Sequence, residues 1–572
     1  MLARTSNRRL PRRSNRWRPD VRRGSQFAAR LILVALLVAL LGALLGGRFG
    51  QAAEATLSER IPVQGIDGTL LLTGSSTPSP ETLATFVRQA GKRSARIVCV
   101  EVVGDSPASP PRSSSDVPWR LAEAWLEHGG AQWLVARVRA GDGLRPDFTA
   151  MLAGATGVWF EARDPVLLAQ WLASDPVAVA CRALRARGVV LGGSASFAHV
   201  VAEFTAIAEQ GENNPVPFQP LAWLPGVALS TGRDDDTRLA AVLRDHPRLV
   251  GLKLHEDAAL LVRQREILVL GAGQTDVRYA AVEGRRDPSH SLGPRQRTAD
   301  LTALRRAAAD RLGAPYPPAA VDAPKVERGT LVIIGGGGTP PGLMQRFVEW
   351  SGGKEACIVV LPISMPDPLP ERDGAAEAFR RAGAKEVHLL TGRTPAEVDR
   401  RETWELLDRA TGIWFGGGRQ WRFVDAYEGT ESLRKMRGVL ARGGVIGGSS
   451  AGATIQGDYL ARGHPLGPHI MMADGYERSF AFLPGTAIDQ HFTQRKRSAD
   501  MLELMARYPQ FLGIGIDETT ALVVRGSVGE VIGKNHVHVF DTRRKDGDGR
   551  PHQETLVDGA RYELVERRVM EK

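Results

Sequence analysis

The stretch GGVIGGSSAGA, Gly443–Ala453, decides the fold of this chain. It closes an apolar run with a Gly-x-Ser-x-Gly turn centred on Ser450. A sharp strand-to-helix turn of this kind needs small neighbours, because its backbone is strained and the next helix packs closely against it. The turn holds the serine oxygen out as a nucleophile. The stretch therefore predicts an α/β fold with a reactive serine at the end of a strand.

An altered copy of the same turn lies earlier in the chain. It reads GVVLGGSASFA, Gly188–Ala198, and it has Ala195 where the later copy has Ser450. Alanine has no nucleophilic oxygen. Only the later half of the chain is therefore predicted to be catalytic, and the earlier half is predicted to be a silent copy.

Three longer blocks repeat in the same order, which indicates a tandem duplication. Gly68–Val100 matches Gly329–Pro362, Ala155–Trp171 matches Ala410–Tyr427, and Leu221–Arg263 matches Phe480–Arg525. The predicted domains are residues 60–277 and 329–572, joined by a Pro-rich linker over 278–328.

Within each copy, short apolar runs rich in β-branched residues alternate with helical stretches. Runs without a clean alternation are typical of strands that are covered on both faces, so each domain is predicted to be a mostly parallel sheet flanked by helices. Ligands bind such sheets at the carboxyl ends of the strands. The unusual residues fall at these ends: Gly335–Gly338, Gly416–Gln420, Ser450 and His491.

The N-terminal segment is predicted to target a membrane. Residues 1–30 hold ten arginines and one acid, Asp20, and residues 31–47 carry no charge. This length suits either a short transmembrane anchor or a signal-peptide core, with Ala53–Ala55 as an A-x-A cleavage site. The positive-inside rule then places the body outside the cytoplasm, either anchored and facing the periplasm or exterior, or secreted after cleavage. The alternative, a buried core helix behind a basic tail, fits the charge asymmetry poorly.

Charge and cysteine content exclude several other classes of protein. The formal net charge of +10 equals the charge of residues 1–48 alone, so no basic face remains for nucleic acid. The three cysteines, Cys99, Cys181 and Cys357, lie on apolar stretches and are predicted to be buried thiols. No CxxC or His/Cys spacing indicates a metal, and we expect neither a metal nor an organic cofactor.

Three segments together resemble a known family: FGGGRQ (Phe415–Gln420), GGSSAGA, and AIDQHFTQRKR (Ala487–Arg497). They resemble the cyanophycinase branch of the serine peptidases related to dipeptidase E, over about Gly329–Asn535. The resemblance implies a class I glutamine-amidotransferase-like fold for both copies. It also implies hydrolysis of an amide next to an aspartyl residue, with a β-aspartyl linkage expected, through an acyl-enzyme.

The resemblance also implies roles for single residues. Ser450 matches the nucleophile and His491 the general base. Backbone N–H groups at Gly417 and Ala451 match the oxyanion hole. The positions that match those holding the substrate's aspartyl backbone and arginine side chain are Gln420, Asp489, Gln490, Arg495 and Arg497.

Two departures from the family pattern leave questions open. The expected acidic stretch between serine and histidine reads ARGHPLGPH, with His464 and Pro465 in place of a carboxylate. We favour Glu477 as the catalytic acid because it lies on the approach to the histidine strand, with Asp458 or Asp474 as alternatives. Asp500 stands where cyanophycin-specific members tend to have an arginine, which leaves recognition of a polymer open.

Other interpretations of these features remain. The serine turn could be a tight turn without chemistry, His491 a structural histidine, and Arg495 and Arg497 a solvated face. The protein could then be an envelope-associated binding module that has lost turnover, or an exopeptidase for short aspartyl peptides. The resemblance also implies that family members pair as dimers, so we expect the silent copy to take the place of a partner subunit, which makes an intramolecular pseudo-dimer.

Overall fold

The protein is described here from a computed structural model. The model describes residues 63–75, 78–104, 132–139, 144, 146–205, 221–232, 236–285, 287, 289–547 and 549–571. The chain divides into two units, residues 1–55 and 56–572, and all described residues belong to the second. The predicted basic tail, the uncharged segment 31–47 and the A-x-A site therefore lie outside the described residues. Within the described ranges, no helix is both long enough and apolar enough to cross a membrane.

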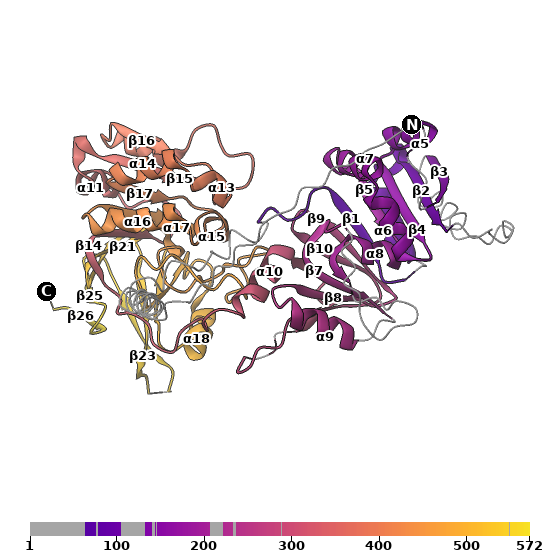
Figure 1. Cartoon of the computed structure of the whole chain (residues 1–572). Coiled ribbons are helices and arrows are strands. Elements are labelled where there is room, and N and C mark those ends of the chain that lie inside the picture. The colour runs from indigo at the N-terminus through magenta and orange to yellow at the C-terminus, as the bar shows by residue number, and fades with distance from the viewer. Residues whose placement is uncertain are drawn as a thin grey trace, which may run out of the picture. The chain divides into compact units, whose positions relative to one another are not determined.

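The first half contains two sheets and the helices that cover them (Figure 1). In spatial order the eight-stranded sheet is β13 (Thr298–Asp300), β10 (Glu266–Gly271), β9 (Ala258–Arg263), β1 (Thr69–Thr73), β5 (Val190–Gly193), β4 (Gly157–Ala162), β2 (Arg96–Val103) and β3 (Gln132–Arg139). The five-stranded sheet is β12 (His290–Leu292), β11 (Thr275–Arg278), β8 (Val250–Leu254), β7 (Leu224–Thr231) and β6 (Ala202–Thr205). The helices are α3 (Pro80–Gln89), α5 (Pro146–Gly154), α6 (Pro165–Ala173), α7 (Asp175–Ala186), α8 (Ala195–Val201), α9 (Asp236–Asp245) and α10 (Leu301–Asp310).

The second half repeats this plan. Its nine-stranded sheet is β16 (Glu386–Leu389), β15 (Cys357–Leu361), β17 (Gly412–Phe415), β18 (Val445–Ser449), β14 (Val326–Ile334), β21 (Thr520–Gly526), β22 (Val528–Gly533), β25 (Arg561–Glu563) and β26 (Arg568–Val569). Its four-stranded sheet is β19 (Thr486–Gln490), β20 (Leu512–Ile516), β23 (Val537–Lys545) and β24 (Pro551–Leu556). The helices are α11 (Leu343–Trp350), α12 (Gly374–Arg381), α13 (Pro395–Val398), α14 (Arg401–Arg409), α15 (Trp421–Tyr427), α16 (Glu431–Ala441), α17 (Ala451–Thr454) and α18 (Ser498–Arg507).

The strand order of the two large sheets is the same. Strands β3, β2, β4, β5, β1, β9 and β10 occupy the places that β16, β15, β17, β18, β14, β21 and β22 occupy in the second half. The α/β class is confirmed, and the repeated order supports the duplication that the sequence blocks indicate.

The arrangement differs from the predicted single, mostly parallel sheet. In the second half, β16, β15, β17, β18 and β14 pair in parallel, but β21 and β22 continue the sheet antiparallel. Because β21 follows β20 after a short turn and covers the free edge of β14, the parallel series stops there. Strands β19 and β20 form a separate sheet with β23 and β24.

The predicted linker is also only partly a linker. Strands β12 and β13 lie within residues 278–328 and pair with strands of the first half's two sheets. Helix α10 follows directly and is buried along most of its length. The first half therefore continues to Asp300, well beyond the predicted boundary at residue 277.

Apolar side chains cover both faces of the second large sheet. On one face, Trp414 of β17 packs edge-on against Phe347 of α11 and Phe379 of α12, with ring centroids 5.7 and 5.4 Å apart. On the other face, Phe415 packs edge-on against Phe423 of α15 at 5.2 Å. Burial on both faces explains the continuous apolar runs of these strands and fixes their carboxyl ends as a rigid edge.

Candidate active site

Ser450 occupies a strained turn between β18 and α17. Its φ is 57° and its ψ is −113°, a conformation that non-glycine residues rarely adopt. Its N–H donates to the carbonyl of Ile334 at 3.0 Å, which ties the turn to the end of β14. Close packing leaves no room for a larger neighbour, because a Cβ at Gly452 would lie 2.0 Å from the carbonyl oxygen of Phe415. The turn thus holds the serine hydroxyl at the carboxyl edge of the sheet.

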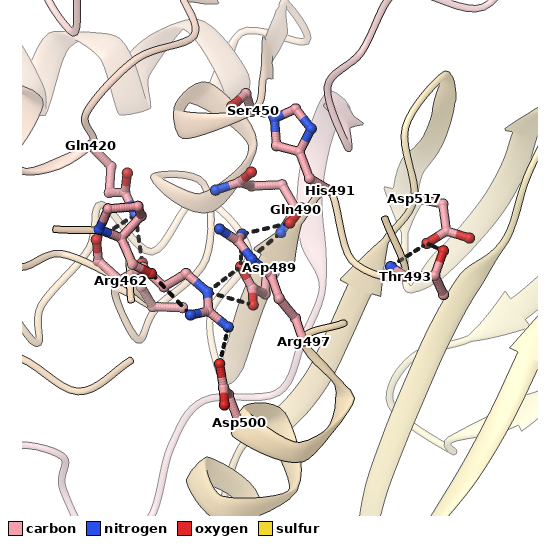
Figure 2. Close-up of polar contacts among 12 residues, drawn as sticks. Gln420, Ser450, Arg462, Asp489, Gln490, His491, Thr493, Arg497, Asp500 and Asp517 are labelled. Carbon is pink, nitrogen blue, oxygen red and sulfur yellow. Dashed lines mark hydrogen bonds and ion pairs between the residues drawn. The ribbon is translucent and has the colours of Figure 1, made fainter. Parts of the chain in front are cut away.

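His491 lies directly against this serine (Figure 2). It follows β19, has a φ of 48°, and donates its backbone N–H to Gly335 at 2.8 Å. Its Nε2 is 2.9 Å from Ser450 Oγ, and its Nδ1 is 2.6 Å from a carboxylate oxygen of Glu518. A hydroxyl, an imidazole and a carboxylate in this order form the arrangement by which serine hydrolases activate their nucleophile.

The prediction that Glu477 supplies the acid is wrong. Both ring nitrogens of His491 are already occupied, one by Ser450 and the other by Glu518. The alternatives do not reach the ring either: Asp458 accepts from the hydroxyl of Tyr316 and from the N–H of Gly485, and Asp474 is exposed. The acid therefore follows the histidine in the chain.

The signal for Glu518 lies in strand pairing. Strands β19 and β20 run in parallel, with Gln490 opposite Ile516 at their ends. The residues that follow the two strands, His491 on one and Asp517–Glu518 on the other, therefore emerge side by side. Two acids, Asp517 and Glu518, follow the fully apolar strand LGIGI in the sequence, but only the pairing of these strands identifies Glu518 as the partner of His491.

The glycine-rich loop after β14 lets this pair come close to the sheet. A Cβ at Gly336, where φ is +100°, would lie 2.3 Å from the ring of His491. A Cβ at Gly337, where φ is +66°, would lie 2.6 Å from the side chain of Glu518. Only glycine fits at these two positions, so the loop allows the side chains of His491 and Glu518 to pack directly against its backbone.

The second glycine strip lies beside the serine. A Cβ placed on Gly417 would be 3.5 Å from Ser450 Cβ. The hydroxyl of buried Ser364 donates to the carbonyl oxygens of Gly416 and Gly417 at 3.1 and 2.9 Å, which fixes the strip. Ala451 begins α17, so its N–H is one of the donors without an intrahelical partner. The structure thus brings Gly417 and Ala451 to the nucleophile, and Ser364 is a supporting residue that the sequence did not single out.

The positions predicted to hold substrate fall into two groups. Asp489 is fully buried, and its carboxylate accepts from Arg462 at 3.0 Å and from Arg497 at 2.7 Å (Figure 2). A carboxylate buried and paired in this way cannot contact a substrate directly, so Asp489 holds the two arginines. Gln420 is similarly used within the protein, since its Nε2 donates to the carbonyls of Ala461 and Arg462.

Gln490 and Arg495 remain available. The Oε1 of Gln490 has no hydrogen-bond partner within the described part of the chain although it is buried, and its side chain lies between Ser450 and the Asp489 ion pairs in Figure 2. Arg495 is exposed and close enough to His491 to affect its protonation. Of the predicted substrate positions, these two are therefore the ones whose side chains are not already used in the ion pairs or hydrogen bonds described above.

The environment lowers the pKa of His491 below its usual 6.5. Partial burial is the largest cause, because it penalises the imidazolium, and the positive charge of Arg495 adds to it, whereas the hydrogen bond that Nδ1 donates to Glu518 opposes both. A lower pKa keeps the imidazole neutral, which is the form that can accept the serine proton.

We therefore expect the acidic limb of the kcat/KM profile to lie below pH 6.5, with activity lost as pH falls through the His491 pKa. Glu518→Gln removes the carboxylate charge that helps to raise this pKa, so the limb should move to still lower pH while the plateau falls. Rates measured from pH 4 to 9 for both proteins test this. A limb of the wild-type profile above pH 6.5 would contradict the assignment of His491 as the base.

The first half has lost this constellation. Ala195 is already the first residue of helix α8 and has no positive φ, so the strained turn has relaxed together with the loss of the serine. Gly232 follows β7 where His491 follows β19. Glu256, two residues after β8, is the counterpart of Glu518, and the histidine position opposite it is Gly232.

A serine-reactive fluorophosphonate probe should consequently label the full chain once, on the peptide that contains Ser450. Peptide mapping by mass spectrometry gives the site, and Ser450→Ala provides the control, which should show no label. Modification of a peptide within Gly188–Phe197 would show that the first half is reactive.

Comparisons with known proteins found a matching family model and similar sequences. The model of peptidase family S51 matches residues 331–532. A cyanophycinase of Geminocystis herdmanii (strain PCC 6308) is 31% identical over 221 residues, which cover 37% of this chain and 81% of that protein. A cyanophycinase of Trichormus variabilis (strain ATCC 29413 / PCC 7937) is 27% identical over 237 residues, which cover 40% and 79%. A crystal structure of a peptidase from an acI-B1 Actinobacterium is 21% identical, with a TM-score of 0.33, and the match covers 42% of this chain and 98% of that one.

The α/β fold and the serine–histidine pair define a serine hydrolase. This chain belongs to peptidase family S51, and it is a serine peptidase. The resemblance drawn from the sequence is confirmed.

Proposed function

We propose that the second half hydrolyses amide bonds next to aspartyl residues, with β-aspartyl linkages of a cyanophycin-like peptide as the substrate class. The observation that carries the proposal is the continuous contact from Ser450 Oγ through His491 to Glu518, at 2.9 and 2.6 Å. Binding alone does not require a serine, a histidine and an acid in hydrogen-bond contact with one another, so this contact favours a catalytic function over a binding module.

The proposed reaction is a two-step acyl transfer. Ser450 Oγ attacks the scissile carbonyl carbon while its proton passes to His491 Nε2, and Glu518 holds the proton on Nδ1 and stabilises the imidazolium. The oxyanion accepts hydrogen bonds from the N–H groups of Gly417 and Ala451. His491 returns the proton to the leaving amine as the C–N bond breaks. Water, deprotonated by the same imidazole, then cleaves the ester and regenerates Ser450.

Charge and hydrogen-bonding capacity near the serine support an aspartyl substrate. A residue linked through its aspartyl group presents a free carboxylate close to the scissile amide, and exposed Arg495 offers a cation to receive it. The unpartnered Oε1 of Gln490 can accept from a substrate N–H. The two relatives described above are both named cyanophycinases, which favours the same substrate class here.

One observation favours a second candidate, an exopeptidase for short aspartyl peptides. The carboxylate of Asp500 accepts a hydrogen bond from the guanidinium of Arg462 at 2.6 Å. The position therefore carries a negative charge that is already paired within the protein. A carboxylate there cannot attract the free carboxylates of such a polymer in the way that an arginine would. Short substrates would not need this contact.

Incubation of the purified full chain with β-Asp-Arg polymer and with α- and β-aspartyl dipeptides tests the two candidates. We expect amine release from the polymer, and Ser450→Ala is the matched control. Release from dipeptides alone would favour the exopeptidase. No Ser450-dependent release from any of these substrates would overturn the proposed function.

We also propose that the body lies outside the cytoplasm and that the first half takes the place of a partner subunit. The arginine-rich N-terminal sequence supports the location. The pairing is supported by Arg265 of the first half, which donates to Asp425 and to the hydroxyl of Tyr476 in the second half, each at 2.7 Å. Such an intramolecular pair predicts a monomer of about 62 kDa by light scattering of the full chain, less if the N-terminal segment is cleaved.

A further inference from the structure

Two histidines and an aspartate meet behind the catalytic acid. Asp517 directly follows β20, His536 directly precedes β23, and His538 is the second residue of β23. Asp517 Oδ2 is 3.6 Å from His536 Nδ1 and 3.5 Å from His538 Nε2, and one ligand atom of each residue lies within 4.8 Å of those of the other two. Sequence inspection missed this cluster because its members are separated in the chain and carry no familiar spacing.

The two distances from Asp517 are close to those between the ligands of a small cation. Two atoms bound to zinc at about 2.0–2.1 Å with tetrahedral angles lie roughly 3.4 Å apart. Imidazole and carboxylate groups are the ligands that zinc and related first-row divalent ions take. Three protein ligands leave a fourth position for water, and His536, which is half exposed, gives access from solvent.

His538 is the second, independent observation. The residue is only 7% exposed, and its Nε2 makes no hydrogen bond within the described part of the chain. Its Nδ1 lies 3.1 Å from the hydroxyl of Thr555, which can accept the ring N–H and leave the lone pair of Nε2 directed at the cluster. A neutral imidazole fixed by a partner on its other nitrogen is how histidine is held as a metal ligand.

We propose that Asp517, His536 and His538 bind a divalent metal ion of the zinc type, which braces the active-site loop. The other oxygen of Asp517 accepts from the N–H and the hydroxyl of Thr493, at 2.9 and 2.7 Å (Figure 2). Thr493 stands two residues after His491, and Glu518 directly follows Asp517. An ion on Asp517 therefore fixes the two segments that carry the base and the acid, and its role is positional.

A second cluster of residues with metal-binding side chains is not expected to bind the ion. Cys357, Glu386 and His388 also lie within 4.8 Å of one another. The guanidinium of Arg409 donates to Glu386 at 2.6 Å, so a positive charge already occupies this carboxylate. A cation there would be repelled, and His388→Ala is therefore the matched control.

The test is binding of Co²⁺, a spectroscopic substitute for zinc, to the chelator-treated full chain. We expect one equivalent to give the visible spectrum of a four-coordinate ion, and one equivalent of Zn²⁺ to displace it. His536→Ala and Asp517→Asn should abolish the spectrum, and His388→Ala should leave it unchanged. His536 is on the surface, so its variant should keep the far-ultraviolet circular dichroism of the wild type. No saturable spectrum in the wild type, or one that survives His536→Ala, would overturn the site.

The bracing role has its own readout. The rate constant for fluorophosphonate labelling of Ser450 should rise several-fold when Zn²⁺ is added to the chelated wild type. The same addition should change nothing in His536→Ala. Metal binding without a change in labelling rate would overturn the bracing role.

Discussion

Ser450→Ala should reduce turnover by about 10⁵- to 10⁶-fold, because loss of the nucleophile removes the covalent route entirely. The fold should survive. Alanine keeps the Cβ and the strained backbone at a φ of 57°, and it removes only the oxygen that faces His491. Turnover of an aspartyl substrate and the circular dichroism spectrum measure the two effects.

Ser449→Ala is the matched control for this change. Ser449 is the last residue of β18 and is the neighbouring hydroxyl in the same turn. Its variant should remain within a few-fold of the wild type. If Ser450→Ala kept most of the activity while Ser449→Ala lost it, the nucleophile would have to be reassigned.

Glu518→Gln should reduce turnover by about 10² to 10⁴-fold. The amide can still bond to Nδ1, but it no longer stabilises the imidazolium and it allows the wrong tautomer. The side chain of Glu518 is 35% exposed, so water offsets part of the loss, and we expect a value toward the lower end of this range. Single-turnover kinetics with an activated ester separate this effect from substrate binding.

Glu477→Gln distinguishes the observed acid from the predicted one. Burial, with help from Asp474, raises the pKa of Glu477 to about 8, so at pH 7 this side chain is largely the neutral acid that glutamine imitates. Its variant should keep nearly full activity. A loss after Glu477→Gln as large as that after Glu518→Gln would contradict the geometry of the site.

The sequence determined the features that depend on a few neighbouring residues. A strained turn around a serine has to be built from small residues, and so Gly448, Ser450 and Gly452 were recognisable together. The loss of Ser450's counterpart at Ala195 was recognisable for the same reason. The α/β class followed from apolar runs whose length and composition reflect burial on both faces.

Only the tertiary structure decided which distant groups meet. Glu518 reaches His491 because β19 and β20 pair in parallel, and no local pattern records that pairing. Asp489 looked like a substrate ligand in its motif, but folding buries it between Arg462 and Arg497. Asp517, His536 and His538 likewise come together only when β23 returns beside β20. A local motif can specify a turn because its atoms are covalent neighbours, whereas a charge partner is selected by strand register, which is set by the packing of the whole sheet.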